Sequence, residues 1–499
     1  MKWETIVGLE AHAELSTRTK VFCACEAAYG GEPNTRVCPV CLGLPGALPA
    51  LNRAVVDSAL RVALALGARV ADVSWFERKS YFYPDLPKGY QITQAQAPIC
   101  RGGGLKIFIP SIGWKTVRAR AVLIEEDSGK LIHDGARSLA DFNRSGVPLL
   151  EIVTEPDMRG GAEAAAFLEA LRETLLYLGV SDCKMHEGSL RADVNVSVRR
   201  AGSDADAQPG ARVEIKNLNS FRAVARAVEA EAARQIAALE SGADVARETR
   251  RWDDEAQVSI PMRAKETADG YRYFREPDLP PVVVDERWLA GIRDAMPELA
   301  WQKRERYARD LGLPVRHRST LTRQKNVSDL FEAVAARSDP IGAAWVSDEI
   351  LNIARNARIP REDLTFHEGD RAGSGRHSLD VRKLAALASL KTEGRISREA
   401  FKLAAEAILE RDAEPVAFIA KKRLAKLPDA AAAAMAAAAV RKVLAKYPEA
   451  ADECRAGKTK AFEFLMGRVM RKLGAAVDPG MARKALEDGL RDLAGSPAG

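Results

Sequence analysis

Four of the chain's seven cysteines lie in one stretch, "FCACEAAYGGEPNTRVCPVC" (22–41). A C-x-C pair, Cys23 and Cys25, is followed after twelve residues by a C-x-x-C pair, Cys38 and Cys41, with turn-forming residues between them. Two such pairs can surround a tetrahedral zinc ion, whereas cysteines packed as small apolar side chains are the alternative. Four thiolates leave no coordination position for water or substrate. The predicted zinc site is therefore structural, and the chemistry should lie elsewhere.

At 499 residues, the chain is long enough for about two to four domains. It contains no apolar run of about 18 residues, so no membrane-spanning segment is expected. The stretch "MKWETIVGLEAHAEL" carries charges where a signal peptide has an apolar run. We therefore expect a cytoplasmic protein without a membrane partner, whose thiols stay reduced.

Short alternating segments, interrupted by helical ones, fill the first part of the chain. Segments such as "TIVGLEAHAEL", "VRARAVLI" and "LRADVNVSVR" alternate as strands do, whereas "AEAAAFLEALRETLLYLG" has helical periodicity and ends in Gly. This pattern predicts an α+β domain with a largely antiparallel sheet. Beyond about residue 293 the strand signals fade and helical patterns remain. We expect three domains, over residues 1–292, 293–410 and 411–499.

The positive charge is concentrated in the last of these regions. Residues 411–499 contain 17 Lys and Arg against 11 Asp and Glu, and this excess of six equals the net charge of +6 for the whole chain. A basic tail on a neutral body suggests a polyanionic partner for the tail. A solvated helical face explains the same charge equally well.

Polar residues alternate along several of the expected strands. In "GLEAHAEL", Glu10, His12 and Glu14 share one strand face. A neutral imidazole beside carboxylates is the outline of a site for a hard cation. An ordinary solvated strand face is the alternative, and this segment alone favours it.

Further segments support the metal site. In "VPLLEIV", Glu151 stands alone in an apolar run typical of a strand buried on both faces, where a carboxylate needs a cation or a proton. In "LIEEDSGK", Glu125 lies close to a turn. The alternating strands "LRADVNVSVR" and "RVEIKN" combine acidic and basic residues on their polar faces, namely Arg191, Asp193, Glu214 and Lys216. Such combinations suit magnesium plus phosphate, provided that the strands meet.

The stretch "FERKSYFYPDLPKGYQITQ" combines basic and aromatic residues in a segment that Pro84 and Pro87 stiffen. Its basic side chains, among them Lys79 and Lys88, could grip a nucleotide or an RNA end by charge while its rings stack on bases. A structural loop with its aromatic rings packed inward is the alternative.

Many of these segments together resemble the GatB family, the B subunits of tRNA-dependent amidotransferases. The matching stretches are "VGLEAHAEL", "EPNTRVCPVCLGLPGALP", "RKSYFYPDLPKGYQITQ", "EEDSGKLIH", "DFNRSGVPLLEIVTEPD", "YLGVSDCKMHEGSLRADVNVSV", "EIKNLNSFRAV", "RYFREPDLPP" and "CRAGKTKAFEFLMGRVM". The resemblance covers nearly the whole chain and includes both the cysteine cluster and the polar strands.

The resemblance implies a two-step reaction on a mischarged tRNA. ATP phosphorylates the side-chain carboxylate of glutamyl-tRNA(Gln), aspartyl-tRNA(Asn) or both, and ammonia then displaces the phosphate to give the amide. The family's A subunit, an amidase, releases the ammonia from glutamine, and a small C subunit joins the two. The implied fold is a cradle-like α+β domain, followed by an all-α domain and a helical tail that binds tRNA.

The resemblance also implies a set of residues for each cofactor. The family's magnesium ligands correspond to Glu10, His12, Glu125, Glu151, Asp193 and Glu214, and Glu125 is in addition expected to be catalytic. Lys79 and Lys88, which are also expected to be catalytic, match basic residues that face ATP phosphate and the incoming ammonia. The ligands of a structural zinc ion correspond to Cys23, Cys25, Cys38 and Cys41. Strand parity, and not the family, adds Arg191 and Lys216 as phosphate contacts.

One position departs from the family pattern, because Leu123 stands where members often have a His. A different class of function is a non-catalytic tRNA-binding zinc protein, in which the carboxylates are ordinary surface residues. A free-standing ligase that uses ammonia directly is disfavoured, because no glutaminase nucleophile motif is evident in the sequence. A partner is therefore expected to supply the nitrogen.

Overall fold

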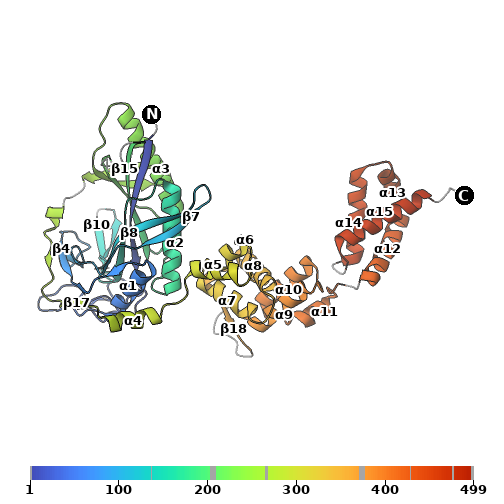
Figure 1. The fold of residues 1–499 in the computed structure, drawn as a ribbon, viewed down its shortest axis with the longest axis horizontal. Helices are drawn as coiled ribbons and strands as arrows, with labels where there is room; N and C mark the ends of the chain where they lie inside the picture. The colour runs from blue at the N-terminus through green and yellow to red at the C-terminus, as the bar shows by residue number, and fades with distance from the viewer. Residues whose placement is uncertain are drawn as a thin grey trace. The chain divides into compact units, whose positions relative to one another are not determined.

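The computed structural model describes residues 3–135, 137–202, 210–264, 268–369, 377–426, 429–474 and 477–495. The chain divides into two compact units, Met1–Leu299 and Ala300–Gly499 (Figure 1). The fold is α+β, with a largely antiparallel sheet followed by a helical C-terminal region, as the sequence predicted. The domain borders expected at residues 292 and 410 stay predictions.

Most strands of the first unit belong to one sheet. Its described strands follow the order β15-β14-β13-β12-β1-β11-β8-β6-β2, and β7 pairs with β8. Only the β13–β14 pair among them is parallel. The strands are β1 Trp3–Glu14, β2 Arg69–Val70, β6 Cys100–Arg101, β7 Gly104–Ile109, β8 Gly113–Glu126, β11 Pro148–Thr154, β12 Leu190–Arg200, β13 Val213–Lys216, β14 Glu248–Asp253 and β15 Val258–Ala264.

Helices cover this sheet because its strands alternate. Leu9, Ala11 and Ala13 of β1 are buried, whereas Glu10 and His12 point to the opposite face. Two long helices, α2 and α3, pack against each other and contact β1 (Figure 1). The described helices of this unit are α1 Arg53–Ala65, α2 Gly161–Leu178, α3 Phe221–Glu240 and α4 Glu286–Asp294, with the short 3₁₀ helix η1 Ala268–Tyr271.

Smaller sheets complete the unit. The three-stranded sheet consists of β16 Phe274–Arg275, β4 Glu77–Ser80 and β5 Tyr90–Thr93. Two strand pairs are β3 Val73–Ser74 with β17 Val282–Val283, and β9 Lys130–Asp134 with β10 Arg137–Asp141. Gln91 and Thr93 of β5 bond to Glu125 of β8, so the small sheet lies on the polar face of the large one.

The second unit is mainly helical and contains two hydrophobic clusters. One cluster includes Phe331 and Leu387, and the other includes Leu465 and Leu486. The helices are α5 Ala300–Arg309, α6 Val315–Leu321, α7 Lys325–Ala335, α8 Pro340–Asn356, η2 Arg361–Asp363, α9 Val381–Thr392, α10 Arg398–Arg411, α11 Pro415–Lys422, α12 Asp429–Lys446, α13 Pro448–Arg455, α14 Thr459–Leu473 and α15 Pro479–Gly495.

This helical region also contains one short parallel strand pair, β18 Leu364–His367 and β19 His377–Asp380, which the sequence analysis did not predict. Each strand has four residues, too few to show a period. Among the helices of the described residues, none has both the length and the apolar character needed to cross a bilayer.

Candidate active site and zinc site

The polar residues of the first unit meet because their strands are neighbours in the sheet. Strand β1 lies between β12 and β11, with Glu10 opposite Asp193 and His12 opposite Glu151. Directly paired residues in an antiparallel sheet point to the same face. The four side chains therefore share one face around the centre of the sheet.

The next strands outward add one carboxylate each. Leu149, two residues before Glu151, pairs with Glu125 on β8. On the other side, Asn195, two residues after Asp193, pairs with Glu214 on β13. Because side-chain direction repeats every two residues, Glu125 and Glu214 point to the same face as the central four. Five consecutive strands thus bring together all six residues that the sequence analysis named.

These six side chains form two groups of three. One group is His12, Glu125 and Glu151, and the other is Glu10, Asp193 and Glu214; within each group, one ligand atom from every residue lies within 4.8 Å of the others. A magnesium ion holds its ligands at about 2.1 Å, so opposite ligand atoms lie about 4.2 Å apart. Both groups are compact enough for a divalent ion after small side-chain adjustments, and oxygen predominates in each, as magnesium requires.

Burial and neighbouring charges shift the pKa values of two of these donors, Glu151 and His12. Burial and the charges of Glu125 and Glu10 raise the pKa of Glu151 well above its usual range. Burial lowers the pKa of His12, against the pull of the neighbouring carboxylates, and so favours a neutral ring that can act as a ligand. A divalent cation would remove the like-charge repulsion that keeps the proton on Glu151.

Glu125 is held in place by polar side chains of β5. It is 4% exposed, accepts a hydrogen bond from the Thr93 hydroxyl, and lies 3.3 Å from Gln91 Nε2. Burial lowers the pKa of Lys79. The carboxylates of Glu125 and Glu151 outweigh this effect and raise the pKa of the lysine above its usual value. Lys79 therefore stays charged beside the first group of metal donors.

The two cations chosen from strand parity, Arg191 and Lys216, already contact carboxylates. The Arg191 guanidinium lies 2.6 Å from Asp127 Oδ2. Lys216 forms an ion pair with Asp193 and has Glu214 Oε1 at 3.6 Å. They lie on the polar face, and their role as phosphate contacts stays a prediction.

Sequence reasoning missed several contacts of this site, although it had already placed Glu14 on the face of Glu10 and His12. Lys88 pairs with buried Glu126, although only Lys88 was singled out. Asn195 donates to Glu10 Oε1 at 2.9 Å, while its buried Oδ1 has no hydrogen-bond partner among the described residues. Glu14, whose pKa burial and Asp127 raise to about 8, continues the same face. Strand alternation marks Asn195 and Glu14, whereas no local signal marks the pairing of Lys88.

Leu123, the position where the family pattern differs, lies in the site. It pairs with Glu151 across β8 and β11, and therefore shares a face with Glu125. An apolar side chain thus borders the first group of metal donors.

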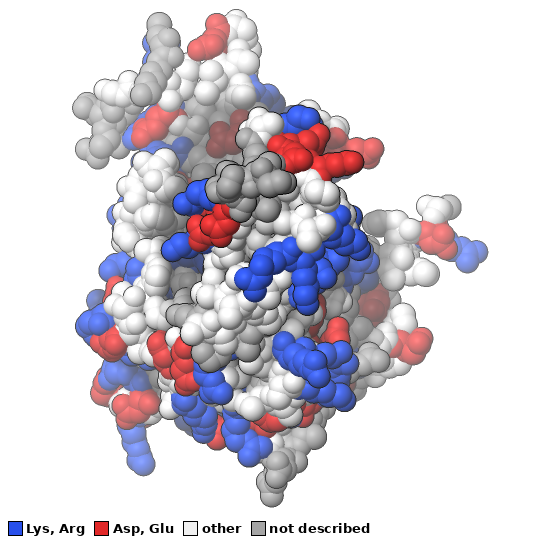
Figure 2. Space-filling model, turned by 90° about the vertical axis from the view of Figure 1, so that its right-hand side faces the viewer, with Lys and Arg blue, Asp and Glu red and all other residues white. Residues whose placement is uncertain are grey.

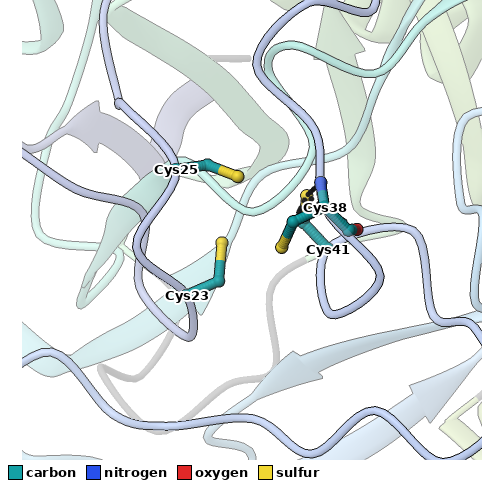
Figure 3. A group of neighbouring side chains, drawn as sticks. All are labelled: Cys23, Cys25, Cys38 and Cys41. Atoms are coloured by element: carbon teal, nitrogen blue, oxygen red, sulfur yellow. Dashed lines mark hydrogen bonds between the residues drawn. The ribbon is translucent and has the colours of Figure 1, made fainter.

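The four clustered cysteines also converge. Figure 3 shows Cys23 and Cys25 on one side and Cys38 and Cys41 on the other, with their sulfur atoms turned toward a common space. The sulfur atoms lie within 4.8 Å of one another, and those of Cys38 and Cys41 are 3.9 Å apart. A zinc–sulfur distance of about 2.3 Å gives tetrahedral edges of about 3.8 Å, so the thiol set fits zinc.

A buried lysine supports this cluster. The Lys20 side chain is fully buried, and its ammonium donates to Arg36 O at 2.8 Å and to Phe142 O at 3.3 Å, with Cys41 Sγ at 3.7 Å. A hydrogen bond from Cys23, with a smaller contribution from the Lys20 charge, lowers the pKa of Cys41 to about 4. Cys41 is thus favoured as a thiolate, the form that binds metal.

The sheet that carries this site belongs to a known class of catalytic domain. Residues 5–290 match the family model described as the GatB/GatE catalytic domain. Residues 329–490 match a second model, described as the GatB domain. The chain therefore belongs to the GatB family, as its motifs indicated.

Curated relatives agree over the full length. The chain is 43% identical over 497 residues to a protein of Caldicellulosiruptor bescii, covering 99% of this chain and 100% of the relative. It is 44% identical over 498 residues to a protein of Moorella thermoacetica, with coverages of 98% and 100%. Both relatives are named as the B subunit of an aspartyl/glutamyl-tRNA(Asn/Gln) amidotransferase.

Proposed function

We propose that the chain is the subunit of an aspartyl/glutamyl-tRNA amidotransferase that activates the mischarged aminoacyl group with ATP and converts it into an amide. One observation carries the chemical part of this proposal: two groups of metal donors lie on one sheet face, beside charged Lys79. The full-length similarity to proteins of that name supports the substrate class.

The reaction explains why ATP is needed. A carboxylate is a poor acyl donor because its leaving group would be oxide, whereas an acyl phosphate releases a stabilised phosphate. The first step joins the γ-phosphoryl group of ATP to a side-chain carboxylate oxygen and releases ADP. Ammonia then attacks the carbonyl carbon, phosphate leaves with the carbon–oxygen bond pair, and the amide nitrogen loses a proton.

Each group of residues has a separate task in this scheme. The two groups of three donors would hold magnesium, which supplies charge neutralisation for the transferred phosphoryl group. Lys79 keeps a positive charge beside Glu125 and Glu151 and attracts phosphate oxygens. Thr93 and Gln91 orient the carboxylate of Glu125.

Exclusion of water is the second requirement, because an acyl phosphate is readily hydrolysed. The small sheet β16–β4–β5 lies on the polar face of the large sheet and carries Lys79. The ring of Tyr271 lies 5.0 Å from Lys79 Nζ, and the ring of Tyr273 packs against that of Tyr271 with centroids 6.0 Å apart. We assign these elements the role of restricting solvent around the activated carboxyl group.

Partners supply what this chain does not. We propose an amidase A subunit as the source of ammonia, a small C subunit, and the tRNA as the polyanion that binds the basic tail. Figure 2 shows that Lys and Arg side chains gather in patches on the face that it draws. The exposed basic residues of the described part of the tail are Arg411, Lys421, Lys422, Arg423, Arg441, Lys442, Lys446, Lys458, Lys460, Arg471, Lys472, Arg483, Lys484 and Arg491.

The proposal is tested by ATP turnover in the complex with its partner subunits, mischarged tRNA and glutamine. Glu125→Ala should abolish ATP turnover in a protein that still folds. Deletion of the tail from Arg411 should preserve turnover once the tRNA concentration is raised, because the tail contributes binding and not chemistry. An unchanged turnover in Glu125→Ala would instead favour the non-catalytic, tRNA-binding zinc protein.

A further inference from the structure

The zinc site and the Lys88–Glu126 pair are neighbours in this fold. A pocket of about 100 Å³ is lined both by Cys23, Cys41 and Gly43 and by Lys88 and Glu126. The side chains of Lys88 and Glu126 are only 9% and 4% exposed. The turn that follows the second cysteine pair therefore forms a wall beside a buried ion pair.

Gly43 brings this turn against Lys88. A Cβ atom built on Gly43 would lie 2.2 Å from Lys88 Cγ, 3.0 Å from its Cβ and 3.1 Å from its Cα. The turn itself is fixed by hydrogen bonds from Leu42 N to Cys38 O at 3.0 Å and from Gly43 N to Val40 O at 3.0 Å. The turn that holds Gly43 in place is thus the one that carries Cys38 and Cys41.

Gly146 makes a second contact, on the side of Glu126. A Cβ atom there would lie 3.5 Å from Cys41 Cβ, 3.5 Å from Lys20 Cδ and 4.0 Å from Glu126 Oε2. Backbone of this residue therefore lies between the zinc site and the partner of Lys88. Glu126 Oε1 also accepts a hydrogen bond from Ile92 N at 2.8 Å, which leaves the pair little freedom to move.

We propose that the zinc-binding turn is a positioning element for Lys88, acting through the space that Gly43 leaves for the lysine stem. The metal is then more than a structural ion: by fixing Cys38 and Cys41, it keeps Lys88 on Glu126. The consequence for catalysis rests on the proposed function and on the catalytic role that the family resemblance implies for Lys88, but the positioning itself does not.

Two glycines of the same loop provide a matched test. Gly43→Ala and Gly46→Ala place a side chain at similar backbone angles, with φ of +67° and +84°, but nothing lies within 4 Å of a Cβ at Gly46. Gly43→Ala has to move the Lys88 stem by about 1 Å to restore an ordinary contact, and a displacement of this size costs on the order of 100-fold in rate. In the complete complex, amide formation should fall by about 100-fold in Gly43→Ala and change by less than about twofold in Gly46→Ala.

The second readout does not depend on the reaction. Amine labelling with acetic anhydride, read by mass spectrometry, should modify Lys88 in Gly43→Ala while the bound zinc stays unchanged. It should modify Lys88 in the parent chain only after a zinc-selective chelator has removed the metal. Lys303, which is 6% exposed in the second unit, is the control lysine and should stay protected throughout.

Continued protection of Lys88 after zinc removal would overturn the proposal, even if Gly43→Ala fails to fold. Protection of Lys88 in a folded Gly43→Ala protein would overturn it as well. Lys88 could become labelled both in Gly43→Ala and after zinc removal while amide formation in Gly43→Ala stays unchanged. This result would support the positioning and refute the catalytic role of Lys88.

Discussion

Replacing Lys20 by Met should weaken zinc binding more than it weakens the fold. The ammonium group donates to two carbonyl oxygens and lies 3.7 Å from Cys41 Sγ, in a position without solvent exposure. Partners of metal ligands at this distance typically contribute 10- to 100-fold to metal affinity, or about 1.4–2.7 kcal/mol. We expect a loss of that size in Lys20→Met.

The effect on the zinc-free fold should be smaller because two contributions oppose each other. Loss of the donor removes the hydrogen bond to Arg36 O, at a cost of about 1–3 kcal/mol. Phe142 O keeps the hydrogen bond that Ser145 N donates at 3.1 Å, so the loss there is smaller. Removal of a fully buried charge relieves a desolvation penalty of several kcal/mol, and Met has nearly the same volume. The variant should therefore fold, with most of its defect confined to the metal-bound state.

Competition with a chromophoric chelator measures the zinc affinity, and thermal unfolding with and without zinc measures the two states separately. Lys303→Met is the matched control, since Lys303 is buried in the other unit with Glu332 at 2.7 Å. Its loss should leave zinc affinity unchanged. An affinity of Lys20→Met within about twofold of the parent protein would refute the assigned contribution of Lys20.

Three further predictions follow from the same geometry. Cys38→Ser should lower folding stability or tRNA affinity, because it removes one of the four zinc ligands. Unfolding and filter binding measure the two quantities. Full stability and full tRNA affinity without zinc would contradict the structural role of the zinc site. Glu125→Ala should weaken binding of Mn²⁺, a paramagnetic probe for magnesium, by at least about tenfold in electron paramagnetic resonance titrations, while far-ultraviolet circular dichroism stays unchanged. The raised pKa of Glu151 means that the fold binds this proton more tightly than the unfolded chain does. Stability of the metal-free protein should therefore fall as pH rises above about 4.5 toward the folded-state pKa, and Mg²⁺ should restore it. Denaturant unfolding at several pH values tests this, with Glu151→Gln as the reference that lacks this titrating group.

Local pattern was sufficient to predict which face of each strand is polar. Apolar and polar residue types alternate over residues 9–14 of β1 and 190–199 of β12, so Glu10, His12 and Asp193 could be assigned to polar faces from the sequence. The spacing of the cysteines was likewise sufficient to indicate a four-thiol site. Both are short-range properties, because they depend on residues that are neighbours along the chain.

Contacts between distant segments were out of reach of such reasoning. Lys20 meets the carbonyl of Phe142 across 122 positions of sequence, and Lys88 meets Glu126 across 38. Neither lysine lies in a periodic pattern that would mark its partner. Their pairing depends on where loops pass each other, and that is set by packing of the whole unit.

By itself, the sequence determined the classes of element, the polar strand faces, the zinc-type cysteine spacing and, through its long motifs, the family. Only the tertiary structure decided that β1 lies between β12 and β11, and that Glu125 and Glu214, which are 89 residues apart, reach the same face. It also decided that Gly43 of the zinc turn packs on Lys88. The physical reason is that side-chain periodicity is a local property of the backbone, whereas strand order and loop contacts depend on burial of apolar surface over the complete unit.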